Sequence, residues 1–528
     1  MLQAPTPTTS SELALQAAGF DLSHDELSHA AKKAARAVQQ KVALWSAHGA
    51  SPAAIHRDVR QLARRHSIEL PVKAGITSTL NRLCDASWWR RALRKRLRAV
   101  EHQAIRDGVV HRHASPYVSD RAMRRAKLEH RRTTELLASM DAINQTTGEV
   151  LPLDALIEKS LANPSNRRKA MMARIKGIEE HAKSKGHEAL FLTITCPSRM
   201  HARPTSGTRS APYDGRSPRQ AQTYLHKLWR LAMRKLQHDG IALTGVRVAE
   251  PHQDACPHWH VLTFCAPEHS DQLIETLRTY ALRDTPNEPG AAERRFVVKR
   301  IDPTKGSAVG YVAKYIAKSI DGEGVDTDDE TDAAGSDASM RVVTWARLWA
   351  IRQFQFFGVP AITPTRELYR LDEPAFASEG LQAAHEASKA NNYGAWLTAC
   401  EAYGLRFGVN YSERPSTRYA DEVTKRIEGL TAQACDLAGA LQIITRSEAW
   451  RIEVRGHAEA ANATALALPW TRFTNCAPID FIEVFGTADP EGQTEAERPG
   501  GTGWPSRPHR HRRPPTQTPQ AKARGARC

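Results

Sequence analysis

The sequence lacks any long apolar run, which excludes a helix that spans a bilayer with about 20 consecutive apolar residues. Its first residues also lack the charged-then-apolar order of a signal peptide. The eight cysteines form no Cys-x-x-Cys pair and no framework of regular spacing. We therefore expect free thiols in a reducing compartment, and a soluble intracellular protein.

Positive charge, in contrast, is in excess. The chain of 528 residues carries 74 Lys and Arg against 58 Asp and Glu, a formal net charge of +16. Such an excess favours a polyanionic partner, with nucleic acid as the leading candidate. The length is several times that of a typical domain, so we expect the chain to divide into several units.

Shifts in composition and in hydrophobic periodicity predict the order of these units. One basic stretch surrounds the pair Trp88 and Trp89, and a second runs from Arg121 to Arg132. We interpret these stretches either as solvated helix faces or as a DNA-binding surface. The expected units are a mainly helical, basic N-terminal region (1–185), a central α+β domain (186–322), an acidic linker or surface loop (323–340), a mainly helical C-terminal domain (341–497) and a disordered basic tail (498–528).

The central unit alternates between strand and helix patterns. Short β-branched runs predict strands, and apolar residues at three- and four-residue steps predict helices. The predicted elements are strand 189–195, helix 218–238, strands 245–250 and 258–264 joined as a hairpin, helix 270–282, strand 295–301 and helix 305–320. This order predicts an α+β fold with a central antiparallel sheet and flanking helices.

A pair of histidines inside the second hairpin strand is the first candidate site. His258 and His260 are two residues apart, so their side chains leave the strand on the same face and can meet one ion. The partner strand ends in Glu250, whose carboxylate could complete a site with three ligands and open positions. His252 and Asp254 in the hairpin loop are alternative third ligands.

A pair of tyrosines on the last helix of the central unit is the second candidate site. Tyr311 and Tyr315 lie one helical turn apart on one face, and Lys314 and Lys318 form a parallel row beside them. Such a pair is more often a packing stripe. Here the helix follows basic residues and adjoins the histidine strand, which favours chemistry: a phenol becomes a useful nucleophile when cations and a metal-polarised phosphate assist it.

An H-hydrophobic-H strand followed by a helix with Y-x-x-x-Y resembles the HUH endonuclease superfamily of rolling-circle replication initiators. Three strings are similar to those of the replication gene A proteins of tailed bacteriophages and their prophages: TCPSRMHA (195–202), RVAEPHQDACPHWH (247–260) and RIDPTKGSAVGYVAKYIAKSIDG (300–322). WWRRALRKRLRAVEH (88–102) and NPSNRRKAMMARIKGIEEHAK (163–183) extend the likeness upstream.

This resemblance implies an HUH-like fold and a DNA endonuclease that acts in the cytoplasm of a bacterial host. The enzyme would nick one strand of the phage origin, in single-stranded or supercoiled DNA, through a 5′-phosphotyrosine intermediate, and would later rejoin the displaced strand. Mg²⁺ or Mn²⁺ is the implied cofactor, and host helicase and polymerase are the suggested protein partners. The implied site residues are the metal ligands His258, His260 and Glu250, the nucleophiles Tyr311 and Tyr315, and the assisting Lys314 and Lys318.

Two other interpretations remain open from the residues. One is a relaxase or transposase of the same superfamily, although relaxases place the tyrosine before the histidines and such transposases are much shorter. The other is a non-catalytic basic DNA-binding protein. One departure from the family pattern is Asp254-Ala255-Cys256, where Asp-Gly-Thr is expected; the change affects the turn and removes no ligand.

Overall fold

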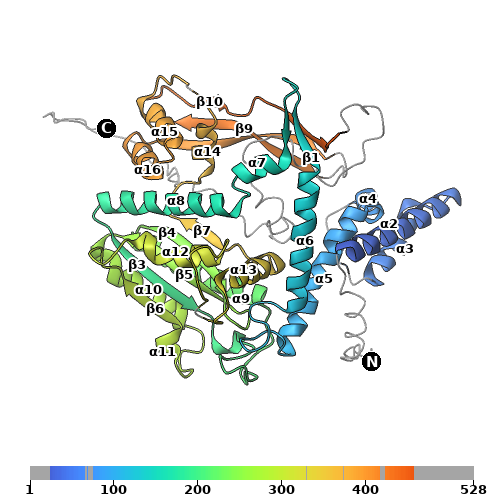
Figure 1. The fold of residues 1–528 in the computed structure, drawn as a ribbon, viewed down its shortest axis with the longest axis horizontal. Helices are drawn as coiled ribbons and strands as arrows, with labels where there is room; N and C mark the ends of the chain where they lie inside the picture. Colours follow the sequence, from blue (N-terminus) through green and yellow to red (C-terminus); the bar gives the residue numbers. More distant parts are fainter. Residues whose placement is uncertain are drawn as a thin grey trace, which may run out of the picture.

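The computed structural model describes residues 24–65, 68, 70, 75–328, 330–372, 374–416 and 422–456 (Figure 1). The predicted disordered tail (498–528) lies outside these residues. Within the described part of the chain, no helix is long and apolar enough to cross a membrane.

The described helices come mainly from the N-terminal and central thirds of the chain. The α-helices are α2 (His24–Ala47), α3 (Pro52–Arg65), α4 (Ile76–Cys84), α5 (Ala86–Arg106), α6 (Asp120–Ala138), α7 (Leu153–Lys159), α8 (Pro164–Ser184), α9 (Pro218–His238), α10 (Ser270–Leu282), α11 (Ala291–Arg294), α12 (Ala308–Lys318), α13 (Gly335–Trp349), α14 (Thr363–Tyr369), α15 (Glu379–Lys389) and α16 (Tyr393–Ala402). Short 3-10 turns are η1 (Ser198–Met200) and η2 (Pro267–His269).

The strands form three antiparallel sheets. The central sheet has the order β6-β3-β5-β4-β7, and two smaller sheets have the orders β11-β1-β2 and β10-β9-β8. The strands are β1 (Met140–Asn144), β2 (Val150–Pro152), β3 (Glu188–Thr195), β4 (Leu243–Pro251), β5 (Pro257–Cys265), β6 (Phe296–Arg300), β7 (Phe354–Phe357), β8 (Arg406–Pro415), β9 (Val423–Gln433), β10 (Leu441–Ile444) and β11 (Trp450–Val454).

The predicted α+β class with a central antiparallel sheet is confirmed. The strands and helices expected between 189 and 320 all form, within a few residues of the predicted bounds. The central sheet also takes an edge strand, β7, from beyond the predicted domain 186–322, because β7 pairs with β4 from Gly245–Phe357 to Val248–Phe354.

Strand β5 is buried along its whole length because both faces of the sheet are covered. Trp259 and Val261 point into one core, which α9 and α10 cover, while Leu262 and Phe264 point into a second core with α8 and α12. The side chains of a strand alternate between faces, so His258 and His260 share the face of Leu262. The histidine pair therefore lies beneath α12.

Local sequence signals explain why the covering helices begin where they do. Helix α9 starts with a capping box, in which the Ser217 and Gln220 side chains each bond to the other residue's backbone, and Pro218 occupies the first turn. Ser307 caps α12 by accepting from the backbone N–H of Gly310. The buried carboxylate of Glu179, on α8, accepts from two further N–H groups at the start of α12 and so joins the two helices.

Helix α8 separates the central sheet from a C-terminal unit made of α14 to α16 and β8 to β10 (Figure 1). The expectation of a mainly helical region from 341 to 497 is wrong for the described residues after 405, which form β8 to β11. Strands 406–415 and 423–433 pair with each other and bury few side chains. The first alternates Phe407, Val409 and Tyr411 with polar or small residues, a strand signal that the sequence interpretation missed, whereas the second lacks a strict alternation.

The N-terminal region is largely helical, as predicted, but its tryptophans are not available to stack on bases. Trp88 and Trp89 are buried in a separate core with α2 and α3, and the Trp89 indole donates to the Leu83 carbonyl. The positive charge lies on the outer faces of α5 and α6 instead. The exposed basic residues there include Arg91, Arg94, Lys95, Arg106, Arg124, Lys127 and Arg131.

Candidate active site

The β4–β5 hairpin brings together the three residues that the sequence suggested as metal ligands. Glu250 lies directly across from His258 in the register of the two strands. Nε2 of His258 is 2.9 Å from Nε2 of His260, and the ligand atoms of all three side chains lie within 4.8 Å of one another. All three residues are buried.

Burial controls the protonation of these ligands. It lowers the pKa of His258 well below its usual range, and it lowers the pKa of His260 to about 3, with the nearby His252 adding to both effects. Both imidazoles are therefore neutral near pH 7 and keep a lone pair for an ion. Burial also raises the pKa of Glu250 to about 7, against the opposing effect of Lys318.

A hydrogen bond on its outer side orients the second histidine. Nδ1 of His260 lies 3.2 Å from the hydroxyl of Thr193, which is its register partner on β3. When Nδ1–H donates to Thr193, Nε2 is left without a proton and faces His258. Two neutral imidazoles and one carboxylate make a donor set that fits a divalent first-row ion.

Helix α12 places both tyrosines over this face of the sheet. The ring of Tyr315 lies 3.9 Å from the ring of His260, measured between centroids. Phe191 on β3 packs among all three rings, with centroid distances of 5.3 Å to Tyr315, 6.0 Å to Tyr311 and 5.7 Å to His260. Both tyrosines and His260 thus pack against one shared aromatic side chain.

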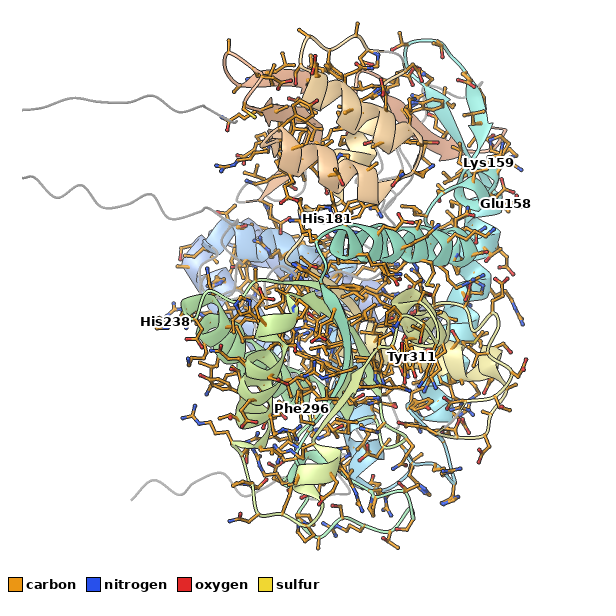
Figure 2. All side chains as sticks on the ribbon, turned by 90° about the vertical axis from the view of Figure 1, so that its left-hand side faces the viewer. Glu158, Lys159, His181, His238, Phe296 and Tyr311 are labelled. Carbon is orange, nitrogen blue, oxygen red and sulfur yellow. The ribbon has the colours of Figure 1, made fainter. Side chains whose placement is uncertain are left out.

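The two tyrosines differ in their surroundings. Tyr311 is 36% exposed and lies on the same side of α8 as Phe296, the first residue of β6 (Figure 2). The ammonium of Lys299, also on β6, lies 4.4 Å from the centroid of the Tyr311 ring. Tyr315 is half-buried, and the ammonium of Lys314 is 5.2 Å from the centroid of its ring. Each phenol therefore has its own cationic neighbour.

Lys318 faces carboxylates rather than the phenols. Its ammonium is 2.7 Å from Oδ1 of Asp328 and 3.6 Å from Oε2 of Glu250. Burial alone would lower the pKa of Lys318, but these two carboxylates raise it, so the ammonium remains charged. Ser319 donates to the other oxygen of Glu250, and the Tyr117 hydroxyl donates to Asp328. Glu250 is thereby held in place from the far side of the site.

The acidic segment after α12 packs against the site instead of forming a solvated linker. Asp328 is buried, and Glu330 accepts from Nδ1 of His252 at 3.0 Å when that nitrogen carries the proton. Asp332 pairs with Arg112 of the N-terminal region. Asp328 contacts Lys318, so the three acidic residues attach the segment to three different parts of the chain.

Asp254, an alternative third ligand, is directed elsewhere. Its carboxylate is 3.3 Å from Nδ1 of His201, where it outweighs the effect of burial and raises the pKa of His201 to about 9. It also accepts from the backbone N–H of Cys256 within the hairpin loop. Asp254 therefore supports the loop, and Ala255 next to it adopts a left-handed conformation with φ 70°.

Sequence reasoning missed several residues of the site. Phe191 and Thr193 stand in a strand that was expected only as buried structure, and their alternation with Leu192 places them on the histidine face. That alternation could have identified them. Tyr117, Asp328 and Glu330 reach the site through long-range contacts, for which no local pattern exists.

The chain was compared with known proteins. The family model described as Bacteriophage replication gene A protein (GPA) matches residues 13–323. The replication protein of Haemophilus phage HP1 (strain HP1c1) is 37% identical over 424 residues, covering 76% of this chain and 54% of the phage protein. The replication gene A protein of Escherichia phage 186 is 36% identical over 397 residues, with 71% and 56% covered.

A probable replication endonuclease from a prophage-like region of Salmonella paratyphi A is 33% identical over 467 residues, covering 83% of this chain and 57% of that protein. The chain spans about half the length of the curated relatives it matches. No solved structure matches it. Since the family match covers more than half of the sequence and includes the histidine strand and both tyrosines, the chain belongs to the bacteriophage replication gene A protein family.

Proposed function

We propose that this chain is a site- and strand-specific DNA endonuclease that nicks a phage origin through a 5′-phosphotyrosine intermediate and so initiates rolling-circle replication. The observation that carries the proposal is the packing of Tyr315 on His260, with 3.9 Å between ring centroids. This contact puts a candidate nucleophile beside a candidate metal centre. The names of the relatives, which include replication proteins and a probable replication endonuclease, support the same activity.

The chemistry is a transfer of one phosphodiester from deoxyribose to tyrosine. The phenolic oxygen attacks the phosphorus, a bond from tyrosine to the 5′ phosphate forms, and the bond to the 3′ oxygen breaks. The phenol loses its proton and the leaving 3′ oxygen gains one, so a free 3′ hydroxyl remains as a primer. A divalent ion such as Mg²⁺ or Mn²⁺, held by Glu250, His258 and His260, would withdraw charge from the non-bridging oxygens.

The side chains around the phenols have separate tasks in this reaction. Lys299 next to Tyr311 and Lys314 next to Tyr315 stabilise the phenolate that forms on attack. Lys318 acts as a positioning residue, because its ammonium contacts Glu250 and no contact between it and either phenol is found in the described part of the chain.

Two tyrosines on one helical face suit a reaction that cuts twice. One tyrosine keeps the first 5′ end while polymerase extends the 3′ hydroxyl and displaces the old strand. The other tyrosine cleaves the regenerated origin, and the released 3′ hydroxyl attacks the first phosphotyrosine to close the displaced strand. Each step exchanges one phosphoester for another, so no external energy source is required.

The basic outer faces of α5 and α6 provide a DNA-binding surface that precedes the catalytic unit. They present Arg91, Arg94, Lys95 and Arg124 to solvent. Contacts between such residues and phosphates hold duplex DNA without reading its sequence, and they weaken as salt increases. We propose that origin DNA lies along these helices while one strand enters the site.

The test uses the full chain, Mg²⁺, and a supercoiled plasmid that carries the origin of the phage or prophage encoding it. Wild-type protein should nick the plasmid and remain attached through a phosphotyrosyl bond that withstands denaturant. Replacement of Tyr311 and Tyr315 together by Phe should abolish the adduct. The matched control is Tyr369→Phe, an exposed tyrosine on α14, which should leave the adduct unchanged.

Two outcomes would reject the proposal. A covalent adduct in the double variant would show that neither tyrosine is the nucleophile. Binding of the plasmid without strand scission in Mg²⁺ or Mn²⁺ would instead support a non-catalytic DNA-binding protein. Sequencing of the phosphotyrosyl peptide identifies which of the two tyrosines reacts in each single variant.

A further inference from the structure

A buried arginine lies on the face of the central sheet opposite the candidate metal centre. Arg247 on β4 is the register partner of Val261, so its side chain points to the core that α9 covers and away from the candidate metal ligands. Only 3% of Arg247 is exposed. Figure 2 shows His238, the last residue of α9, and Tyr311 on opposite sides of the central unit. Arg247 is therefore separate from the proposed nicking site.

The guanidinium of Arg247 lacks a partner for its charge. It stacks on the indole of Trp259, with 3.6 Å from its carbon to the ring centroid, and it makes no hydrogen bond or ion pair within the described residues. Burial, together with the charge of Arg352, lowers the pKa of Arg247 to about 9, so the group stays charged near pH 7. A buried charge without a counter-ion is costly. A bound anion would supply both the acceptors and the counter-charge.

A chain of hydrogen bonds presents a second donor beside this guanidinium. Nε1 of Trp259 donates to Oε1 of the buried Gln222 at 3.0 Å, so the amide nitrogen of Gln222 faces Nε2 of His226 at 3.3 Å. That ring nitrogen accepts when His226 is neutral, and the ring proton then stands on Nδ1. The ring of His226 lies 5.1 Å from that of Trp259, and the residue is exposed. Its Nδ1–H can therefore donate to a ligand from solvent.

Positive charge surrounds these two donors without a counter-charge. Arg352 is exposed just before β7, and its charge acts on Arg247. Arg219, in the first turn of α9, acts on His226 in the same way. Helix α9 and strands β5 and β7 contain no Asp or Glu, and the first carboxylate on β4, Glu250, points to the opposite face. Planar guanidinium donors in a positive setting are suited to a phosphate group.

The outer surface of α9 indicates that this phosphate belongs to a nucleic acid. Lys227, Arg230 and Arg234 are exposed next to His226, and steps of three and four residues place them in one row along the helix. A row of cations fits a ligand that carries phosphates at regular intervals better than it fits a single small anion. The row therefore favours a DNA backbone.

We propose that Arg247, His226 and Arg352 bind a backbone phosphate of duplex DNA on the α9 face of the central sheet, while one strand of the same DNA is nicked at the opposite face. The choice of DNA as the ligand rests on the proposed function. Contacts to phosphate carry no sequence information, so this site positions the origin DNA and does not select its bases. It also explains why the sheet buries an unpaired guanidinium.

The test measures binding of the full chain to a fluorescent linear duplex that carries the origin, by anisotropy over a series of salt concentrations in EDTA. The slope of log affinity against log salt changes by about 0.9 for each phosphate contact. Arg247→Met should weaken binding about tenfold and make the slope shallower by about one contact. Arg352→Gln, at an exposed position, should make the slope shallower to a similar extent. Lys389→Gln is the matched control: it removes one exposed charge from α15, beyond α8, and should leave the slope unchanged.

Urea unfolding separates loss of the site from loss of the fold. Arg247→Met should unfold at the wild-type midpoint or above it, because the substitution removes an unpaired buried charge. A lower midpoint together with wild-type slopes in both variants would assign Arg247 to stacking on Trp259 and overturn the proposal. Stabilisation of the wild type alone by inorganic phosphate, with unchanged slopes, would assign the site to a free anion and would overturn it as well.

An equal change of slope in the Lys389→Gln control would also reject the site, since the effect would then follow net charge rather than position. The binding measurement contains no divalent ion and needs no cleavage, so failure of the nicking test leaves it unaffected. Equally, normal nicking together with wild-type slopes in Arg247→Met and Arg352→Gln would reject this site alone.

Discussion

The aromatic side chain that supports the site gives the sharpest test of how the fold positions the two candidate nucleophiles. Phe191 contacts Tyr311, Tyr315 and His260 at once, and it is almost fully buried. It has no group that could react with DNA. We expect that replacing it by Leu slows formation of the covalent adduct, because both phenols lose the surface that fixes their rings.

The size of the effect follows from these contacts. The ring separations of 5.3 and 6.0 Å to the two tyrosines fall in the range of favourable aromatic pairs, each of which contributes about 0.5–1.5 kcal/mol. The free energy of unfolding of Phe191→Leu should therefore fall by about 1–3 kcal/mol. A displacement of about 1 Å at a reacting group can lower a rate about 100-fold, so we expect adduct formation to slow by about 10- to 100-fold.

The assay is single-turnover adduct formation at saturating origin oligonucleotide, with stability measured by urea unfolding. Phe264→Leu is the matched control, since Phe264 is buried on the same face of β5 beyond His260 and belongs to the same core. It should lose similar stability and keep the wild-type rate. Equal rates in the Phe191 variant and the wild type, or equal loss in both variants, would refute the positioning role.

Three further predictions concern charge and backbone strain. Since burial raises the pKa of Glu250 to about 7, protons should compete with Mn²⁺ below that pH, and affinity should fall by up to about tenfold per pH unit in calorimetric titrations. Lys318→Met leaves the buried carboxylates of Glu250 and Asp328 without their cation and should lower the free energy of unfolding by about 3–5 kcal/mol; adding Asp328→Asn should restore part of it. Ala255→Gly releases about 1–2 kcal/mol of left-handed strain, which offsets about 0.8 kcal/mol for the lost methyl and about 0.5–1 kcal/mol of chain entropy, so its stability should match the wild type. Ala249→Gly in strand β4 has no such release and should cost about 1.5 kcal/mol, a contrast that urea unfolding measures directly.

The central sheet could be predicted from the sequence because each of its elements has a local signal. The run 189–195 is apolar and β-branched, and helix 218–238 has an amphipathic stripe with a proline at its start. The same alternation that defines the strand places His258 and His260 on one face. Their approach to Glu250 then follows from a short hairpin loop, which fixes the register.

The last described strand, β11, could not be predicted in this way, since its partner lies far away in the chain. Strand β11 pairs with β1, although more than 300 residues separate Trp450 from its register partner Asn144. Strand 423–433 has neither a continuous apolar run nor a strict alternation, so no local pattern reveals it. Strand 406–415 does alternate Phe407, Val409 and Tyr411 with polar or small residues, and this signal could have identified it.

The acidic segment shows how composition alone can mislead about a site. Residues 321–339 are rich in Asp and Glu and poor in apolar side chains, which is typical of a solvated linker. However, a buried cation such as Lys318 needs a counter-charge, and the fold supplies it by burying Asp328 from this segment. The sequence did not show that Lys318 would be buried and would need a counter-charge. The helical spacing of Lys314 and Lys318 predicts the direction of their side chains but not how deeply each one is buried. A lysine predicted to assist a phenol thus provides the buried charge that holds an acidic segment in place, and Glu330 of this segment reaches His252, which stacks on the candidate metal ligand His258.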